Sequence, residues 1–345
     1  MAEGKIIGGE FEIEVRQQYQ HKNTMPEGVV TYSSGRSALF NILAYLKSNK
    51  GIKSVLFPDY LCDSVYKMAL KNQMGVEFYE LDKQLNPIYE DVSRKYDTSK
   101  VVLVINYFGL KDCNAIIAEL RGINQQMLLI LDNVQAPYAM LDESEADFSF
   151  SSFRKAFPVA DGSWVLSKNY ALEQHLKINE FAQYKIAASC LKAMRDQQLY
   201  QDEVYLNLFH VGEEKIDDDY LTDMTQLSKN ILADMEWHRW AILRRRNAEI
   251  IVEGLKSLGI KPIMPINEDY VPLFVPVYLK NRDKVRKEMF ANEIFLPVHW
   301  PVEEEYENQL KRGSDLAAHE LSIIIDQRYS VGDMKRILSI LESNI

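Results

Sequence analysis

The chain has 345 residues, 47% of them hydrophobic and 26% charged, and a formal net charge of −10. This composition is ordinary for a globular protein, and the length allows one large domain and a smaller one. The negative charge argues against a nucleic-acid or anionic-membrane surface, and no stretch approaches the ~20 apolar residues of a membrane span.

Cysteine and histidine usage adds two expectations. The cysteines, Cys62, Cys113 and Cys190, are an odd number at no metal-ligand spacing, which favours free thiols in a reducing compartment. The histidines show no metal-ligand spacing either, and the segment from Met1 to Lys5 has no apolar signal core. We therefore expect a cytoplasmic protein without a metal site.

Residues 30 to 165 alternate between strand-like and helix-like segments. The apolar runs that predict strands are 54–58, 76–81, 101–106, 127–131, 148–150 and 164–166. The segments with helical periodicity are 37–47, 63–71 and 113–121. Apolar strands that alternate with helices predict an α/β fold, in which a mostly parallel sheet is covered by helices.

The rest of the chain has a different pattern. Residues 168–252 are nearly all helical in pattern, with one long helix or two over 220–246. From about residue 255 an α+β pattern returns, and its expected elements are strands at 271–278 and 294–297 and a helix at 331–341. From this change of pattern we expect a large domain over residues 1–235 and a small C-terminal domain over residues 236–345.

Small residues, Ser33-Ser-Gly-Arg-Ser-Ala38, form the turn directly before the first expected helix. A helix N-terminus presents free backbone N–H groups and the positive end of the helix dipole, and Gly35 permits the close approach of a phosphate. Gly35, Arg36 and Ser37 are therefore candidate phosphate-binding residues. An ordinary serine N-cap is the competing interpretation.

Asp132 follows four apolar residues at the carboxyl end of an expected strand, where open α/β sheets bind ligands. A carboxylate there can pair with the pyridine nitrogen of pyridoxal phosphate (PLP) and keep it protonated, so that the ring can accept electrons. Gln135 could hydrogen-bond the ring oxygen of the cofactor or cap the chain locally. For Asp132 itself, a helix N-cap or loop position is the alternative.

Lys155 lies further along in a serine-rich turn, between the last two expected strands. A lysine amine forms a Schiff base with the PLP aldehyde, and Arg154 and the cofactor would supply surroundings in which the amine is partly neutral. Ser152 suits phosphate oxygens. A solvated basic turn explains this piece alone, but the three pieces occur in order and at strand ends. Together they predict a PLP site with Lys155 and Asp132 as catalytic residues.

These residues resemble the DegT/DnrJ/StrS-type sugar aminotransferase family, which has the fold-type I PLP architecture. The turn at Ser34–Leu39 is similar to the family's Ser-Gly-Thr-x-Ala-Leu phosphate turn, and Asn106–Gly109 to its His-x-x-Gly turn. The segment Asp132–Ala136 matches its Asp-x-x-Gln-Ala pattern. Lys155 with Gly162, the segment Arg245–Ala248 and the stretch Leu321–Tyr329 are also similar to family motifs.

The chain departs from this family at four positions in the expected pocket. Phe150 stands where the family has a serine five residues before the lysine, and Arg36 replaces the threonine of the phosphate turn. Cys62 aligns with the aromatic residue that stacks on the ring, and Gly162-Ser163 replaces Gly-Gly. We expect Ser152 to replace the missing serine, and Tyr60 or Tyr107 to replace the aromatic residue.

The resemblance implies a PLP-dependent aminotransferase that cycles between PLP and its pyridoxamine form (PMP). Its small-molecule substrates would be an amino donor, expected to be glutamate, and a keto sugar on a nucleotide, in polysaccharide or cell-surface sugar biosynthesis. It also implies a homodimer with the active site at the subunit interface. Two alternatives stay open: another PLP reaction, such as dehydration or conversion of an amino acid, and a non-catalytic regulatory relative. Retention of both Asp132 and Lys155 argues against the second alternative.

Overall fold

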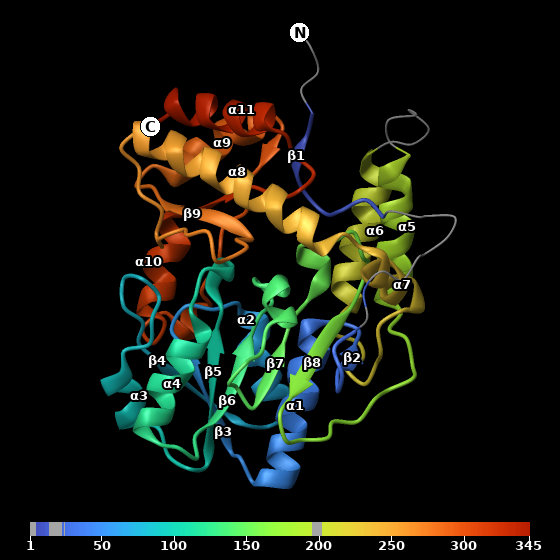
Figure 1. The fold of residues 1–345 in the computed structure, drawn as a ribbon, viewed down its shortest axis with the longest axis vertical. Helices are drawn as coiled ribbons and strands as arrows, with labels where there is room; N and C mark the ends of the chain where they lie inside the picture. Colours follow the sequence, from blue (N-terminus) through green and yellow to red (C-terminus); the bar gives the residue numbers. More distant parts are fainter. Residues whose placement is uncertain (1–4, 14–22, 24, 195–201) are drawn as a thin grey trace.

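The computed structural model describes residues 5–13, 23, 25–194 and 202–345. Its main feature is a seven-stranded sheet with the order β2-β8-β7-β6-β5-β3-β4 (Figure 1). The strands are β2 (Val30–Tyr32), β3 (Ser54–Pro58), β4 (Gly75–Tyr79), β5 (Lys100–Ile105), β6 (Leu128–Asp132), β7 (Phe148–Phe150) and β8 (Ser163–Ser167). β8 is antiparallel to both neighbours, and the other adjacent pairs are parallel. The mostly parallel sheet that the alternating pattern predicts is confirmed.

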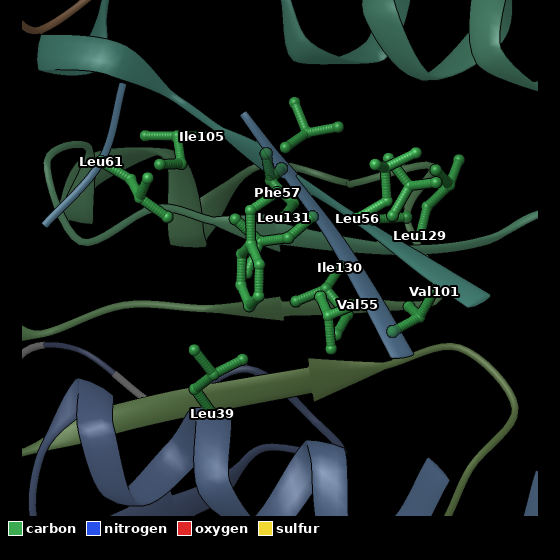
Figure 2. Close-up of a cluster of buried hydrophobic side chains, with 14 of the residues drawn as sticks. Leu39, Val55, Leu56, Phe57, Leu61, Val101, Ile105, Leu129, Ile130 and Leu131 are labelled. Carbon is green, nitrogen blue, oxygen red and sulfur yellow. The ribbon is translucent and has the colours of Figure 1, made fainter. Parts of the chain in front are cut away.

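Four helices alternate with the strands of this sheet. They are α1 (Gly35–Lys50), α2 (Asp63–Lys71), α3 (Tyr89–Lys95) and α4 (Cys113–Ile123). α1 packs on β7 and β8, and α2 packs on β3 and β4. Figure 2 shows part of the core between α1 and the sheet, where Leu39 of α1 points toward sheet side chains, among them Val55 and Ile130. Each fully buried side chain of this kind contributes about 1.5–3 kcal/mol, so the core holds the strand ends firmly in place.

A smaller unit is built mainly from the C-terminal residues. In it, β9 (Phe274–Tyr278) pairs antiparallel with β11 (Glu320–Ile324). Beside them β1 (Ile7–Gly8), from the start of the chain, pairs in parallel with β10 (Ile294–Phe295). The helices of this unit are α8 (Trp237–Ser257), α9 (Arg282–Ala291) and α11 (Val331–Glu342), while α10 (Lys311–His319) places Leu316 in the core of the large sheet.

This smaller unit has a hydrophobic core of its own, to which Ile7 contributes together with residues between 248 and 341. In Figure 1 the unit lies over the carboxyl-end edge of the large sheet. The domain boundary between residues 235 and 236 stays a prediction.

The middle of the chain is less helical than its pattern suggests. Its helices before α8 are α5 (Phe181–Ala193), α6 (Asp202–Lys215) and α7 (Gln226–Asp234), and α5 and α6 lie side by side (Figure 1). The segments 168–180 and 216–225 are not helical, so the expectation of helix over nearly all of 168–252 was wrong there. Tertiary contacts hold the first segment, since the Gln174 side chain donates to the Thr31 carbonyl at 3.0 Å. The region 220–246 contains parts of two helices rather than one long helix.

Three further observations concern the side chains. Among the helices that the structure describes, none is long and apolar enough to cross a membrane. The described residues include no group of three or more His, Cys, Asp or Glu side chains that could hold a metal ion. Cys62, Cys113 and Cys190 form no disulfide.

Candidate functional site

Six of the seven candidate residues line one cavity of about 360 Å³: Gly35, Arg36, Asp132, Gln135, Ser152 and Lys155. The cavity lies where β6 and β7 end and α1 begins, because the register pairs Asp132 with Ile105 on one side and with Phe150 on the other. Carboxyl ends of parallel strands meet at one edge of a sheet, which is where α/β folds bind ligands. The volume of the cavity is within the usual range for small-molecule sites.

The first turn of α1 allows a ligand in the cavity to come close to its backbone. The Ser34 hydroxyl caps the helix by accepting a hydrogen bond from the Ser37 backbone N–H at 3.1 Å. A Cβ atom at Gly35 would lie 3.1 Å from Val134 Cγ2 and 3.4 Å from Ser152 Cβ, so any larger residue would crowd the turn. The helix N-terminus thus reaches the cavity with its positive dipole end exposed to a ligand.

Ser37 is the one candidate that the structure does not bring to the cavity. Its side chain is fully buried, and its hydroxyl donates a hydrogen bond to the Tyr220 carbonyl at 2.5 Å. Ser37 therefore ties α1 to the segment before α7 in this arrangement. Ser152, by contrast, lines the cavity and is only 3% exposed.

Asp132 is buried at the end of β6, with 3% of its surface exposed. Its Oδ1 accepts a hydrogen bond from the Val134 N–H at 2.8 Å. Burial raises the pKa of Asp132 to about 6, and the Val134 hydrogen bond and the charge of Lys155 only partly oppose this effect. A buried carboxylate with an elevated pKa is stabilised by a cation, and a protonated pyridine nitrogen in the cavity would be such a partner.

Lys155 ends a single 3₁₀ turn, η3 (Phe153–Lys155), whose position is set by packing. Phe153 is fully buried and makes an edge-to-face contact with Trp164 at 4.8 Å, and its N–H donates to the Gly162 carbonyl at 3.0 Å. Gly162 has a φ of +117°, which only glycine adopts readily, and this explains the glycine at that position. The aromatic anchor holds the turn so that the lysine side chain extends into the cavity.

The surroundings of the Lys155 amine lower its pKa. The side chain is exposed to the cavity, while protein atoms surround it on the other sides. These protein atoms lower the pKa of Lys155 below its usual value, and Arg154 acts in the same direction, although Cys62, Asp132 and Glu213 oppose them. A neutral amine is the form that attacks a carbonyl carbon.

Gln135 supplies an unused hydrogen-bond donor. Its Oε1 accepts from the Phe108 N–H at 3.0 Å. Its Nε2 is buried and has no partner among the described residues, although Gln135 lines the cavity. An unpaired buried donor costs free energy, and an acceptor oxygen on a bound ligand would remove that cost. This observation fits the ring oxygen of PLP.

An ion-pair network that the sequence did not indicate borders the cavity next to the N-terminus of α1. Glu213 of α6 pairs with Arg36 at 3.1 Å, with Arg154 at 3.0 Å and with Lys185 at 3.2 Å. Burial acts to raise the pKa of Glu213, but Arg154, Lys185 and Arg36 outweigh it and hold the pKa at about 2. Glu213 therefore stays ionised and neutralises part of the positive charge next to the helix N-terminus.

The aromatic residues near the cavity differ from the expectation. Tyr60 and Tyr107 are both buried, stack on each other with centroids 5.5 Å apart, and do not line the cavity. The Tyr107 hydroxyl donates to the Tyr60 carbonyl, and the Tyr60 hydroxyl donates to the His299 carbonyl at 3.2 Å. The expectation that one of them faces the cofactor ring was therefore wrong. Cys62 and Trp300 line the cavity instead.

A second cavity of about 440 Å³ adjoins the first and shares Gln135, Arg154 and Lys155 with it. It is formed between loops at the edge of the large sheet, the segment directly after β1 and the smaller unit, and His299 is part of its lining. Lys155 thus stands between two spaces: the first offers a helix N-terminus and a carboxylate, and the second leads to the smaller unit. A cofactor in the first and a substrate in the second would meet at the amine.

The sheet order and the smaller C-terminal unit define the chain as having the fold of the fold-type I PLP-dependent enzymes. Solved structures that share it include sugar aminotransferases of the DegT/DnrJ/EryC1/StrS type and their relatives. No family model and no curated protein matches the chain.

Three of these structures illustrate the likeness. A putative sugar aminotransferase from Streptococcus pneumoniae in its PMP form has a TM-score of 0.68 and 14% identity, over 91% of this chain and 85% of that one. A DegT DnrJ EryC1 StrS aminotransferase from Brucella abortus has a TM-score of 0.62 and 15% identity, over 91% and 85%. The E. coli GDP-4-keto-6-deoxy-D-mannose-3-dehydratase with bound hydrated PLP has a TM-score of 0.66 and 14% identity, over 91% and 87%. Such identities show a common fold, so the reaction has to be argued from the site.

Proposed function

We propose that this protein is a PLP-dependent aminotransferase that moves an amino group from glutamate to a keto sugar carried on a nucleotide, in polysaccharide or cell-surface sugar biosynthesis. The observation that carries the proposal is that Asp132 and Lys155 line one cavity beside the N-terminus of α1. The low exposure of Asp132 and the unpaired Nε2 of Gln135 support the same assignment.

Different residues would bind different parts of the cofactor. PLP supplies an electron sink for the bonds at the amine-bearing carbon. Asp132 would hold the pyridine nitrogen protonated, and Gln135 Nε2 would donate to the ring oxygen. The backbone at Gly35, with Arg36 and Ser152, would bind the phosphate. Ser37 would not contact the cofactor and would only help to hold the first turn of α1 in position.

Lys155 would have two roles at its Nζ atom. It would bind the cofactor covalently between turnovers, and it would move a proton to and from the reacting substrate carbon as a general base and acid. A lowered pKa of Lys155 suits both roles, because each requires the neutral amine at some stage.

The choice of reaction rests on the comparisons. Two structures of this fold are described as sugar aminotransferases, which supports the keto-sugar substrate. One is a dehydratase that acts on a keto-deoxy sugar nucleotide, so dehydration on the same fold is the second candidate. We also propose a homodimer in the cytoplasm, and the unpaired cysteines agree with a reducing compartment.

The test is a pair of half-reactions on the PLP-loaded protein. L-glutamate should remove the visible absorption band and leave the pyridoxamine form, and a keto sugar nucleotide should then restore the band, giving ping-pong kinetics. If only 2-oxo acids restore the band, the assignment as an aminotransferase stands, but the keto sugar is rejected as its substrate. A PLP-loaded protein that responds to no amino donor would reject the aminotransferase in favour of the dehydratase or a regulatory relative.

A further inference from the structure

We propose that His299 is a catalytic residue that passes a proton to the substrate oxygen leaving as water, and that Glu320 is the positioning residue that holds its imidazole. This proposal rests on the proposed aminotransferase function and deepens it. It concerns the second cavity, which the cofactor-binding residues do not explain.

His299 lies on the segment after β10 and lines the second cavity together with Lys155. Its Nδ1 edge faces the smaller unit, 3.1 Å from the Ser322 hydroxyl and 3.4 Å from Glu320 Oε2. Phe108, Phe274 and Trp300 surround the ring, with centroids 5.7, 5.5 and 5.1 Å away. In the described part of the chain, Nε2 has no hydrogen-bond partner, so it remains free for a ligand in the cavity.

Glu320, the first residue of β11, is unusual because it is a fully buried carboxylate without a Lys or Arg partner in the residues described. Its Oε1 accepts from the Ser322 hydroxyl at 2.5 Å, and its Oε2 accepts from the His299 backbone N–H at 2.8 Å. A glutamine has only one acceptor oxygen and could not accept a hydrogen bond at each of these two positions, and a buried charge is costly unless a partner compensates it. The carboxylate therefore has a use beyond packing: it fixes the ring of His299 and stabilises the imidazolium whenever one forms.

The chemistry of amination requires such a proton carrier. When a ketone and an amine condense, a carbon–nitrogen bond forms, the carbon–oxygen bond breaks, and no electrons are gained or lost overall. The two protons of the departing water both come from the amine nitrogen. His299 would carry the second proton by giving its own to the leaving hydroxyl and taking one from the nitrogen. Lys155 would then be free to act at carbon, so the two residues divide the proton transfers.

The experiment is a single-turnover reaction of the PMP-loaded protein with 2-oxoglutarate, followed by the return of the visible band. In His299→Gln the rate constant at saturating 2-oxoglutarate should fall about 100-fold, the size expected for loss of general acid–base catalysis. The half-saturating concentration should stay within about twofold, because a glutamine still donates a hydrogen bond at that place. In Glu320→Gln the same rate constant should fall about tenfold. His299→Ala should recover rate when imidazole is added, whereas Glu320→Gln should not.

His319→Gln is the matched control, since His319 stacks on Tyr278 outside both cavities. It should react at the wild-type rate. The PLP spectrum and thermal melting of each variant establish that it folds and binds cofactor. A His299→Gln variant with the wild-type rate constant, or one in which only the half-saturating concentration changes, overturns the proton-transfer role while the aminotransferase stands. A wild-type protein that does not react at all overturns the proposed function itself.

Discussion

Replacing Asp132 by asparagine separates the function of this residue from its effect on stability. Burial raises the pKa of Asp132 from 3.8 to about 6 in the protein without ligand. The folded state therefore favours the protonated acid, and stability that is fully present below pH 3.8 is lost as the pH rises through about 6. The gap between the two pKa values corresponds to ~3 kcal/mol at neutral pH. Without cofactor, the ionised carboxylate destabilises the fold by up to that amount.

Asp132→Asn removes this charge and should have opposite effects on stability and catalysis. Without cofactor at pH 7, the variant should be more stable than the wild type by up to ~3 kcal/mol, and the gain should disappear near pH 3.5. With PLP bound, the glutamate half-reaction should slow by about 100-fold or more, because groups that stabilise charge in dry sites are worth ~3 kcal/mol. Urea unfolding at the two pH values and stopped-flow absorption measure the two effects.

Asp161→Asn is the matched control for this experiment. Asp161 is also buried with a pKa raised to about 6, but it accepts hydrogen bonds from Thr225 and Ser228 and does not line the cavity. Its variant should change stability and leave the PLP spectrum and the half-reaction rate as in the wild type. A near-normal half-reaction in Asp132→Asn, or an equal loss in Asp161→Asn, would refute the role of Asp132.

Three further changes test other parts of the site. Lys155→Ala should abolish turnover and the visible PLP band while circular dichroism and melting stay close to wild type, since the side chain extends into a cavity and the buried Phe153 anchors the turn. Glu213→Gln should tighten PLP binding, measured by fluorescence titration, because Arg36 and Arg154 lose the carboxylate that neutralises them; weaker binding would mean that Glu213 orients these cations. Gly35→Ala should weaken PLP binding, since its Cβ would lie 3.1 Å from Val134 Cγ2, and unchanged affinity would contradict the close approach argued for α1.

The sequence could indicate those residues whose positions follow from a local pattern of residue types. Asp132 follows an apolar run, so its place at a strand end follows from strand length and burial. Gly35 precedes a helical pattern, and Lys155 lies in a turn between two strands. Because the carboxyl ends of parallel strands meet at one edge of the sheet, these local positions were enough to predict that the three come together.

The residues that the sequence did not indicate reach the site through long-range packing. Glu213 lies on α6 and Ile216 directly follows it, and nothing in the nearby sequence indicates that they line the cavity. The same limit explains the error at Tyr60 and Tyr107, because both do follow strand ends. Their orientation depends on the contact between the two rings and on the hydrogen bond from the Tyr60 hydroxyl to the His299 carbonyl, which come from separate segments.

The central claim, that Lys155 carries the cofactor of a PLP enzyme, is tested most directly by reducing the PLP-loaded protein with borohydride and mapping the modified peptide by mass spectrometry. One pyridoxyl group is expected, on the peptide that contains Lys155, and none when the cofactor is omitted. A label on another lysine, such as the buried Lys185 or Lys111, or no label at all, would contradict it.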